Sequence, residues 1–221
     1  MTDSRNVKVK ICCISSISEA ALAVSYGADA LGFVSNMPSG PGVISDEMIL
    51  EIIKTVPPSI EKFLLTCETE SEKIIQQQKK FRPDTIQLVD EVSTEVYNEL
   101  KKELPSVRIV QVVHVRDENS VKYAERISEF VDAILLDSGN PDLSVKELGG
   151  TGKVHNWNIS RKICETVNIP VYLAGGLNAG NVEEAIKTVR PYAVDLCSGV
   201  RTDGNLDETK LKNFFKAVRD I

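Results

Sequence analysis

The sequence predicts a single (β/α)8 TIM barrel of the α/β class, extending over residues 1–221. Three observations carry this prediction. Short apolar segments alternate along the whole chain with amphipathic segments of helical period. The length of 221 residues is close to the roughly 250 residues of a typical barrel. No Ser/Gly-rich linker, low-complexity stretch or block of like charges divides the sequence, so composition marks no domain boundary.

The apolar segments define eight predicted strands. In chain order they are VKVKI (7–11), ALGFV (30–34), EKFLLT (61–66), TIQLV (85–89), RIVQVV (108–113), DAILLD (132–137), PVYLAG (170–175) and AVDLCS (193–198). Each is a short apolar run bounded by polar or turn-forming residues, as expected of buried strands.

A helix candidate follows each strand. The candidates span residues 17–26, 46–55, 70–81, 94–103, 120–130, 158–167, 181–189 and 208–219. Gly27 ends the first helix, Ser45 or Asp46 begins the second, and Asn181 begins the seventh. Eight βα repeats in a chain of this length favour a closed parallel barrel, with an open doubly wound sheet as the alternative.

Charge and cysteine content limit the partners. The 26 basic and 32 acidic residues give a net charge of −6, which does not attract nucleic acid or an anionic membrane. The chain has neither an apolar signal core at its N-terminus nor a run approaching the roughly 20 apolar residues of a membrane span. Five cysteines, an odd number, predict free thiols in the cytoplasm. Cys12-Cys13 is not a CxxC motif and only two histidines are present, so we expect no structural metal.

Glycine-rich turns follow the last three strands. Without a Cβ, their backbone N–H groups can approach an anion, and a following helix N-terminus adds partial positive charge. Turns after the last strands form the usual phosphate site of a barrel, although any single turn would also fit a simple βα connection. We expect phosphate to bind Gly150, Gly152, Gly175, Gly176, Ser198 and Gly199. The segment GGTGK is not a nucleotide P-loop, because Val154 follows Lys153 and the glycine spacing differs.

Seven segments together form a distinctive set. They are KIC (10–12), YGADALGFV (26–34), IQL (86–88), AILLDS (133–138), GGTGK (149–153) with Trp157, LAGGLNAGNVEEAI (173–186) and VRPYAVDLCSGV (189–200). In content and order the set resembles the phosphoribosylanthranilate isomerase family of tryptophan biosynthesis. The resemblance implies an Amadori rearrangement of N-(5-phosphoribosyl)anthranilate to 1-(2-carboxyphenylamino)-1-deoxyribulose 5-phosphate. It also implies a monomer or homodimer that uses no cofactor.

The resemblance assigns two catalytic residues. A general acid must open the furanose ring at its oxygen, and a general base must remove the C2′ proton of the resulting iminium. The family pattern makes Cys12 the base and Asp137 the acid. Near neutral pH these roles need a lowered thiol pKa and a raised carboxyl pKa. From the residues alone, the favoured interpretations are a small core residue for Cys12 and a strand-end cap for Asp137.

Asp195 lies within an apolar strand, where an inward carboxylate is costly unless it has a partner. The resemblance places this aspartate near the anthranilate amine of the substrate. A structural ion pair is the alternative.

Several positions depart from the family pattern. The loop after the second strand reads Ser39-Gly40-Pro41-Gly42, where the family carries a Ser-Pro-Arg segment whose arginine pairs with the anthranilate carboxylate. Gly42 cannot make that bidentate contact. Cys13 replaces a glycine, and Val89-Asp90 replaces the end of a QLHG segment. Arg201 replaces a glutamate and is expected either to offer the substrate a cation or to be a solvated loop arginine.

These features leave three hypotheses for function. The first is a phosphoribosylanthranilate isomerase, and the second is a paralogous isomerase for a different phosphosugar amine. The third is a phosphate-binding barrel without catalysis. The missing loop arginine separates the first hypothesis from the other two, whereas Cys12 and Asp137 favour an enzyme over a binding protein.

Overall fold

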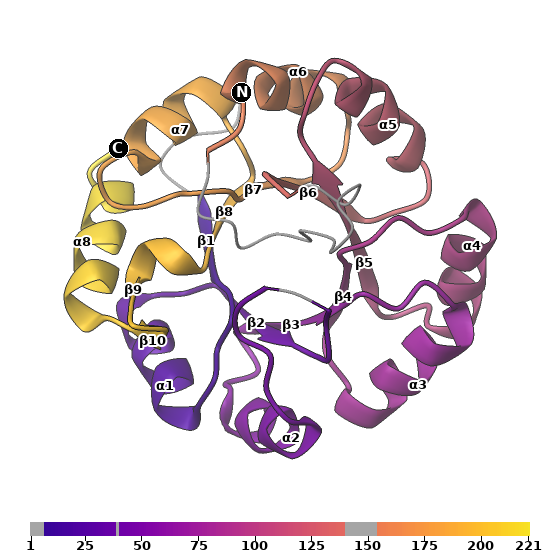
Figure 1. Ribbon diagram of the computed structural model, residues 1–221, viewed down its shortest axis with the longest axis horizontal. Helices are drawn as coiled ribbons and strands as arrows, with labels where there is room; N and C mark the ends of the chain where they lie inside the picture. The colour runs from indigo at the N-terminus through magenta and orange to yellow at the C-terminus, as the bar shows by residue number, and fades with distance from the viewer. Residues whose placement is uncertain (1–6, 39, 140–153) are drawn as a thin grey trace.

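The computed structural model describes residues 7–38, 40–139 and 154–221. These form a closed parallel barrel inside a ring of helices (Figure 1). The strands are β1 (Lys8–Ile11), β2 (Ala30–Val34), β3 (Glu61–Thr66), β4 (Thr85–Leu88), β5 (Arg108–His114), β6 (Ala133–Asp137), β7 (Val171–Leu173) and β8 (Ala193–Leu196). All eight predicted strands are confirmed. The open doubly wound alternative is wrong, because β8 pairs with β1 and closes the sheet.

The surrounding helices match the predicted repeat. They are α1 (Ile17–Tyr26), α2 (Asp46–Thr55), α3 (Ser71–Phe81), α4 (Thr94–Glu103), α5 (Asn119–Ile127), α6 (Trp157–Thr166), α7 (Val182–Val189) and α8 (Glu208–Arg219). Gly27 ends α1 with a φ of 103°, and its N–H donates to the carbonyls of Ala23 and Val24. Ser45 is the N-cap of α2 and accepts the Met48 N–H. Asn181 precedes α7 but makes no side-chain cap.

Alternation along the strands separates two apolar regions. Outward residues such as Ile11, Leu64 and Ile134 pack against the helices. Inward residues such as Phe63 and Leu135 fill the barrel itself. A fully buried side chain of this size stabilises the fold by roughly 1.5–3 kcal/mol. The parallel strands all end at one face of the barrel, which we call the barrel mouth. Side chains that point inward from the last residues of the strands lie there, next to the following loops.

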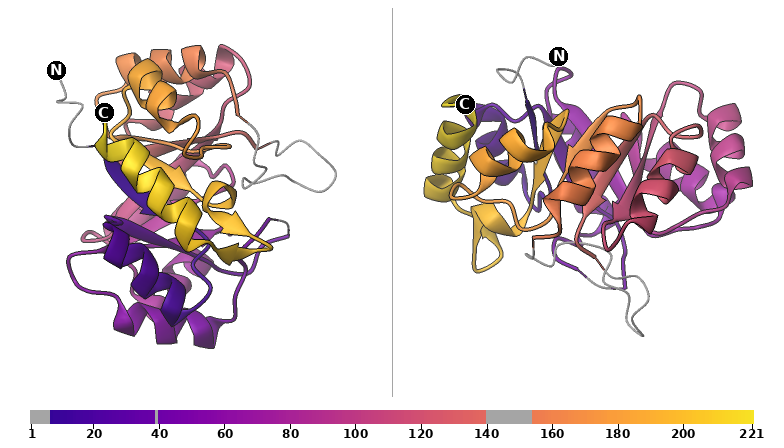
Figure 2. Two further views of the ribbon diagram at one scale, coloured as in Figure 1. Left: turned by 90° about the vertical axis from the view of Figure 1, so that its left-hand side faces the viewer. Right: turned by 90° about the horizontal axis from the view of Figure 1, so that it is seen from above.

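A short hairpin after β8 was not predicted. The 3-10 turn η2 (Ser198–Val200) leads into β9 (Arg201–Thr202) and β10 (Asn205–Leu206), which project beyond the barrel beside α8 (Figure 2). Strands of two residues are too short for a period-two pattern. The sequence did contain a local signal, because the pair Asp203-Gly204 is typical of tight hairpin turns. In the structure both residues have the positive φ that such a turn requires.

Among the helices of the described ranges, none has the length and apolar character needed to cross a membrane.

Candidate active site

A buried ion pair lies inside the barrel between β1 and β8. Lys10 and Asp195 are opposite each other in the strand register, and Lys10 Nζ is 2.8 Å from Asp195 Oδ1. Lys10 is fully buried, and its Nζ lies 5.0 Å from the centre of the Phe63 ring. Burial alone would lower the pKa of Lys10, but the charge of Asp195 raises it above the ordinary value. The structural ion pair considered for Asp195 is therefore present.

Sequence reasoning missed Lys10. Its signal was positional, because Lys10 and Cys12 are two residues apart on β1 and therefore point to the same face. With Cys12 directed into the barrel, Lys10 must be directed inward too. An inward lysine requires an anionic partner, and Asp195 provides it.

Cys12 follows β1 at the barrel mouth. Its N–H donates to the carbonyl of Leu196 at 2.7 Å, which extends the pairing of β1 with β8. A Cβ at Gly32 would lie 2.8 Å from Cys12 Sγ and 3.2 Å from Lys10 Nζ, so the thiol and the ammonium both border the space left by this glycine. A hydrogen bond from the Cys13 side chain, together with the charge of Lys10, lowers the pKa of Cys12 against the opposing effect of burial. This direction suits a general base.

Asp137 is the last residue of β6. In the barrel, β7 and β8 lie between β6 and β1. Its Oδ1 accepts the Ser138 N–H at 2.7 Å, and the side chain is half-buried. The barrel thus holds Cys12 and Asp137 on different walls of one mouth, as expected for residues that act on two sides of a sugar.

His114 is a second residue that sequence reasoning missed. It lies opposite Asp137 in the pairing of β5 with β6, and its Nε2 is 3.1 Å from the Val89 carbonyl oxygen. Burial lowers the pKa of His114, which keeps the imidazole neutral at pH 7. Its position at the end of β5, in register with the candidate acid, is the signal that could have identified it.

Four of the predicted phosphate-binding residues lie in two turns that touch. Gly175 and Gly176 follow β7 with φ values of 85° and 64°, and Ser198 and Gly199 follow β8. The turns pack so closely that a Cβ on Gly199 would lie 1.9 Å from the Leu177 carbonyl oxygen. The other two predicted residues, Gly150 and Gly152, lie outside the described residues, as does Lys153.

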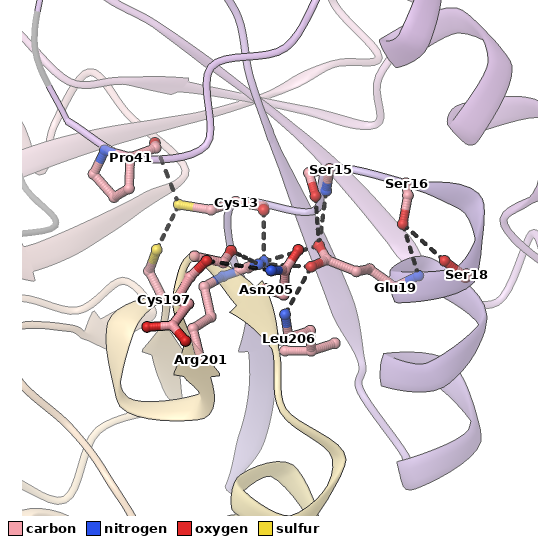
Figure 3. Close-up of polar contacts among 12 residues, drawn as sticks. Cys13, Ser15, Ser16, Ser18, Glu19, Pro41, Cys197, Arg201, Asn205 and Leu206 are labelled. Carbon is pink, nitrogen blue, oxygen red and sulfur yellow. Dashed lines mark hydrogen bonds and ion pairs between the residues drawn. The ribbon is translucent and has the colours of Figure 1, made fainter.

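Arg201 joins the hairpin to the segment after β1 (Figure 3). Its Nη1 is 2.8 Å from Glu19 Oε1, and its Nη2 donates to the carbonyl oxygens of Cys13 at 2.6 Å and Cys12 at 3.3 Å. Only 8% of Arg201 is exposed, so the expectation of a solvated loop arginine is wrong. The guanidinium is directed toward backbone carbonyls and Glu19, which does not favour a direct contact with substrate. Glu19, which the sequence did not reveal, also accepts the N–H groups of Ser15 and Leu206.

Cys13 and Gly42 fit together sterically. Cys13 has a φ of 62°, a conformation that glycine adopts more readily, and it occupies the position where the family pattern has glycine. Gly42 lies against it, because a Cβ on Gly42 would be 2.4 Å from Cys13 Cβ and 2.9 Å from Cys13 Cα. Two departures from the family pattern therefore meet in space. The side chain and backbone of Cys13, together with the φ of 83° at Gly42, oppose a side chain at position 42.

Across residues 7–38, 40–139 and 154–221, no group of three His, Cys, Asp or Glu side chains is placed to hold a metal ion. The described mouth therefore offers a thiol, carboxylates, a neutral imidazole and glycine turns. A closed barrel with such groups at the strand ends belongs to the class of (β/α)8 acid–base enzymes.

Comparisons with known proteins narrow this class. The chain matches the family described as N-(5'phosphoribosyl)anthranilate (PRA) isomerase over residues 9–217. It is 32% identical to the N-(5'-phosphoribosyl)anthranilate isomerase of Methanocella arvoryzae, covering 96% of this chain and 98% of that protein. The crystal structure of phosphoribosyl anthranilate isomerase from Thermotoga maritima superposes with a TM-score of 0.83 at 32% identity, covering 97% and 100% of the two chains. An isomerase in complex with reduced 1-(o-carboxyphenylamino)-1-deoxyribulose 5-phosphate gives a TM-score of 0.80 at 30% identity, with the same coverage.

The chain belongs to the N-(5'-phosphoribosyl)anthranilate isomerase family.

The buried pair gives a first prediction. Lys10→Met leaves the Asp195 carboxylate buried without its cation and should lower the free energy of unfolding by about 3–5 kcal/mol. Lys62→Met is the matched control, since Lys62 pairs with the partly exposed Asp84 and should cost about 1 kcal/mol or less. Urea denaturation measures both. Equal stability of the two variants would contradict a strong role for the buried pair.

The contact between turns gives a second prediction. Gly199→Ala inserts a methyl group against the Leu177 carbonyl and should destabilise the fold by about 1–3 kcal/mol while weakening phosphate binding. Gly180→Ala is the control, because its nearest new contact is a side-chain oxygen of Asn178 at 3.2 Å. Thermal denaturation with and without inorganic phosphate tests both effects. A Gly199→Ala protein with unchanged stability and phosphate response would refute the close packing of the turns.

Proposed function

We propose that the protein catalyses the Amadori rearrangement of N-(5-phosphoribosyl)anthranilate to 1-(2-carboxyphenylamino)-1-deoxyribulose 5-phosphate. The observation that carries the proposal is the placement of Cys12 at the mouth beside the Lys10–Asp195 pair, with Asp137 on another wall. Membership of the isomerase family supports the same reaction. The enzyme acts in the cytoplasm as a monomer or homodimer.

Two proton transfers account for the reaction. Asp137 donates a proton to the ring oxygen as the C1′–O bond breaks, and the nitrogen lone pair forms the iminium. The Cys12 thiolate then removes the C2′ proton, which gives an enolamine that tautomerises to the ketone. Cys13 and Lys10 lower the pKa of Cys12, which favours the thiolate form needed to take this proton.

The phosphate end of the substrate binds the glycine turns. In this proposal the backbone N–H groups after β7 and β8 receive the phosphate oxygens, joined by Gly150 and Gly152 of the loop after β6. Backbone N–H groups are sufficient to bind the phosphate in this proposal, so the site does not depend on basic side chains in a chain whose net charge is negative. The turns hold the phosphate on the side of the mouth formed by β7 and β8.

Asp195 and Arg201 act next to the proposed base. Asp195 Oδ1 receives the Lys10 ammonium, and we assign the second carboxylate oxygen to the substrate's anthranilate amine. Arg201 acts through its hydrogen bonds to the carbonyls of Cys12 and Cys13. It therefore positions the base segment.

The acid gives a third prediction. Asp137→Asn keeps the size of the side chain but has no acidic proton, so turnover should fall by about 10²–10⁴-fold while product-analogue binding changes little. Steady-state kinetics with phosphoribosylanthranilate and calorimetric titration of the reduced product measure the two quantities. Asp117→Asn, in the loop before α5, is the control and should keep its activity. Turnover of Asp137→Asn within about tenfold of the original protein would exclude a general-acid role.

A second candidate, an isomerase for another phosphosugar amine, is favoured by Gly42. A charge-assisted hydrogen bond to a carboxylate contributes roughly 1.5–3 kcal/mol, so its absence weakens anthranilate binding by roughly tenfold to a hundredfold. An arginine cannot simply be restored, because Cys13 fills the space beside Gly42.

This gives a fourth prediction. Gly42→Arg alone should destabilise the loop, because Gly42 has a φ of 83° and its new Cβ would meet Cys13. Adding Cys13→Gly removes the closest contact, so the double variant should be less destabilised and should lower the KM for phosphoribosylanthranilate by roughly tenfold to a hundredfold. Cys13→Gly alone is the control for the altered backbone. If the original protein already has ordinary isomerase efficiency and the double variant gains nothing, anthranilate is favoured as the native aglycone. An inactive original protein and an active double variant would favour the second candidate.

A further inference from the structure

Two thiols meet at the barrel mouth beside the proposed base. Cys13 follows Cys12 after β1, and Cys197 follows β8. Their sulfur atoms are 2.7 Å apart, closer than two thiols ordinarily pack (Figure 3). On its other side, Cys13 Sγ is 3.6 Å from the Pro41 carbonyl oxygen. The loop after β2 therefore holds the Cys13 side chain toward Cys197.

Two adjacent strand ends bring Cys13 and Cys197 together. β1 and β8 are hydrogen-bonded neighbours, with Ile11 opposite Leu196, so the residues after these two lie on adjacent strand ends. Neighbouring strands are roughly 4.8 Å apart. In this register Cys12 is level with Cys197 and Cys13 lies one residue further along, so it is the 2.7 Å contact between sulfur atoms that selects Cys13 as the partner of Cys197. Disulfide-bonded cysteines have Cα atoms about 4.4–6.8 Å apart, a range that neighbouring strand ends can meet.

We propose that Cys13 and Cys197 form a reversible disulfide when the protein meets a peroxide. The Cys197 thiolate attacks the O–O bond, which gives a sulfenic acid and a hydroxide that leaves as water. Cys13 sulfur then displaces the sulfenic hydroxyl, which takes the Cys13 proton and also leaves as water. Two thiols and one hydrogen peroxide thus give one disulfide and two waters, with both electrons passing to the peroxide.

Cys67 and Cys164 do not belong to this pair of neighbouring thiols. Cys67 follows β3, and its Sγ lies 3.4 Å from the Asn36 carbonyl oxygen. Cys164 belongs to α6 in the outer ring of helices. Cys197 is more exposed than the buried Cys12 and Cys13, so peroxide reaches its sulfur more readily.

The disulfide would act on the neighbouring base. In the reduced protein the Cys13 side chain supplies a hydrogen bond that stabilises the Cys12 thiolate. Bonded to Cys197, Cys13 has no S–H to donate, and Cys12 becomes a weaker acid. This consequence rests on the proposed isomerase function, whereas formation of the disulfide does not.

Mass spectrometry tests the bond directly. The experiment uses four proteins: the original full-length protein, Cys13→Ser, Cys197→Ser and the control Cys164→Ser. Each is treated with hydrogen peroxide, quenched with N-ethylmaleimide and digested with trypsin without reductant. We expect a peptide linking residues 11–54 to residues 188–201 in the original protein and the control, lost in both serine variants and reversed by dithiothreitol. A link that persists in Cys13→Ser would assign the bond to Cys12. That result, or irreversible oxidation without any link, would overturn the proposal.

An activity measurement tests the consequence. Peroxide should lower isomerase turnover roughly tenfold at neutral pH, the size of effect expected when a thiolate loses one hydrogen bond, and dithiothreitol should restore it. Cys197→Ser should keep its reduced activity and resist the treatment. A cross-linked protein of full activity would overturn the inhibitory effect. A reduced protein without isomerase activity that still forms the link would contradict the proposed function and leave the disulfide assigned.

Discussion

The pairing of β1 with β8 is the contact on which the rest of the site depends. It closes the barrel, and in the same register it places Lys10 opposite Asp195. Removal of either charge would leave the other buried without compensation, at a cost of several kcal/mol. The next inward residues along these strands are Cys12 and Cys197, so the ion pair lies directly beneath the thiols of the mouth. Barrel closure and the charge around the proposed base therefore follow from one register.

A second ion pair holds the same segment from outside the barrel. The left-handed conformation of Cys13 costs about 1 kcal/mol or more for a residue other than glycine. Arg201 contacts the carbonyls of Cys12 and Cys13 and is itself held by Glu19 of α1. These charge-assisted hydrogen bonds can offset the local strain. The hairpin after β8 thereby contributes to the position of a residue that follows β1.

The sequence predicted the architecture because each βα repeat carries a local signal of its own. Strand and helix periods, caps at Gly27 and Ser45 and the number of repeats were sufficient for the barrel. The pairwise contacts of the site were harder to predict, since Arg201 and Glu19 are 182 residues apart and neither position has a local pattern. Lys10 was accessible in principle from its two-residue spacing to Cys12. Steric exclusion between Cys13 and Gly42 requires coordinates, because both positions look like independent substitutions in the chain.

The two ends of the site have diverged to different degrees for a physical reason. Cys12 and Asp137 lie where strands end, so their backbone positions are fixed by the barrel pairing. Gly42 lies in a loop, where backbone and side chains can vary without loss of the core. Yet this loop is not independent of β1, because Cys13 occupies the volume that a side chain at position 42 would need. The loop after β2 and the residue after the proposed base therefore constrain each other sterically.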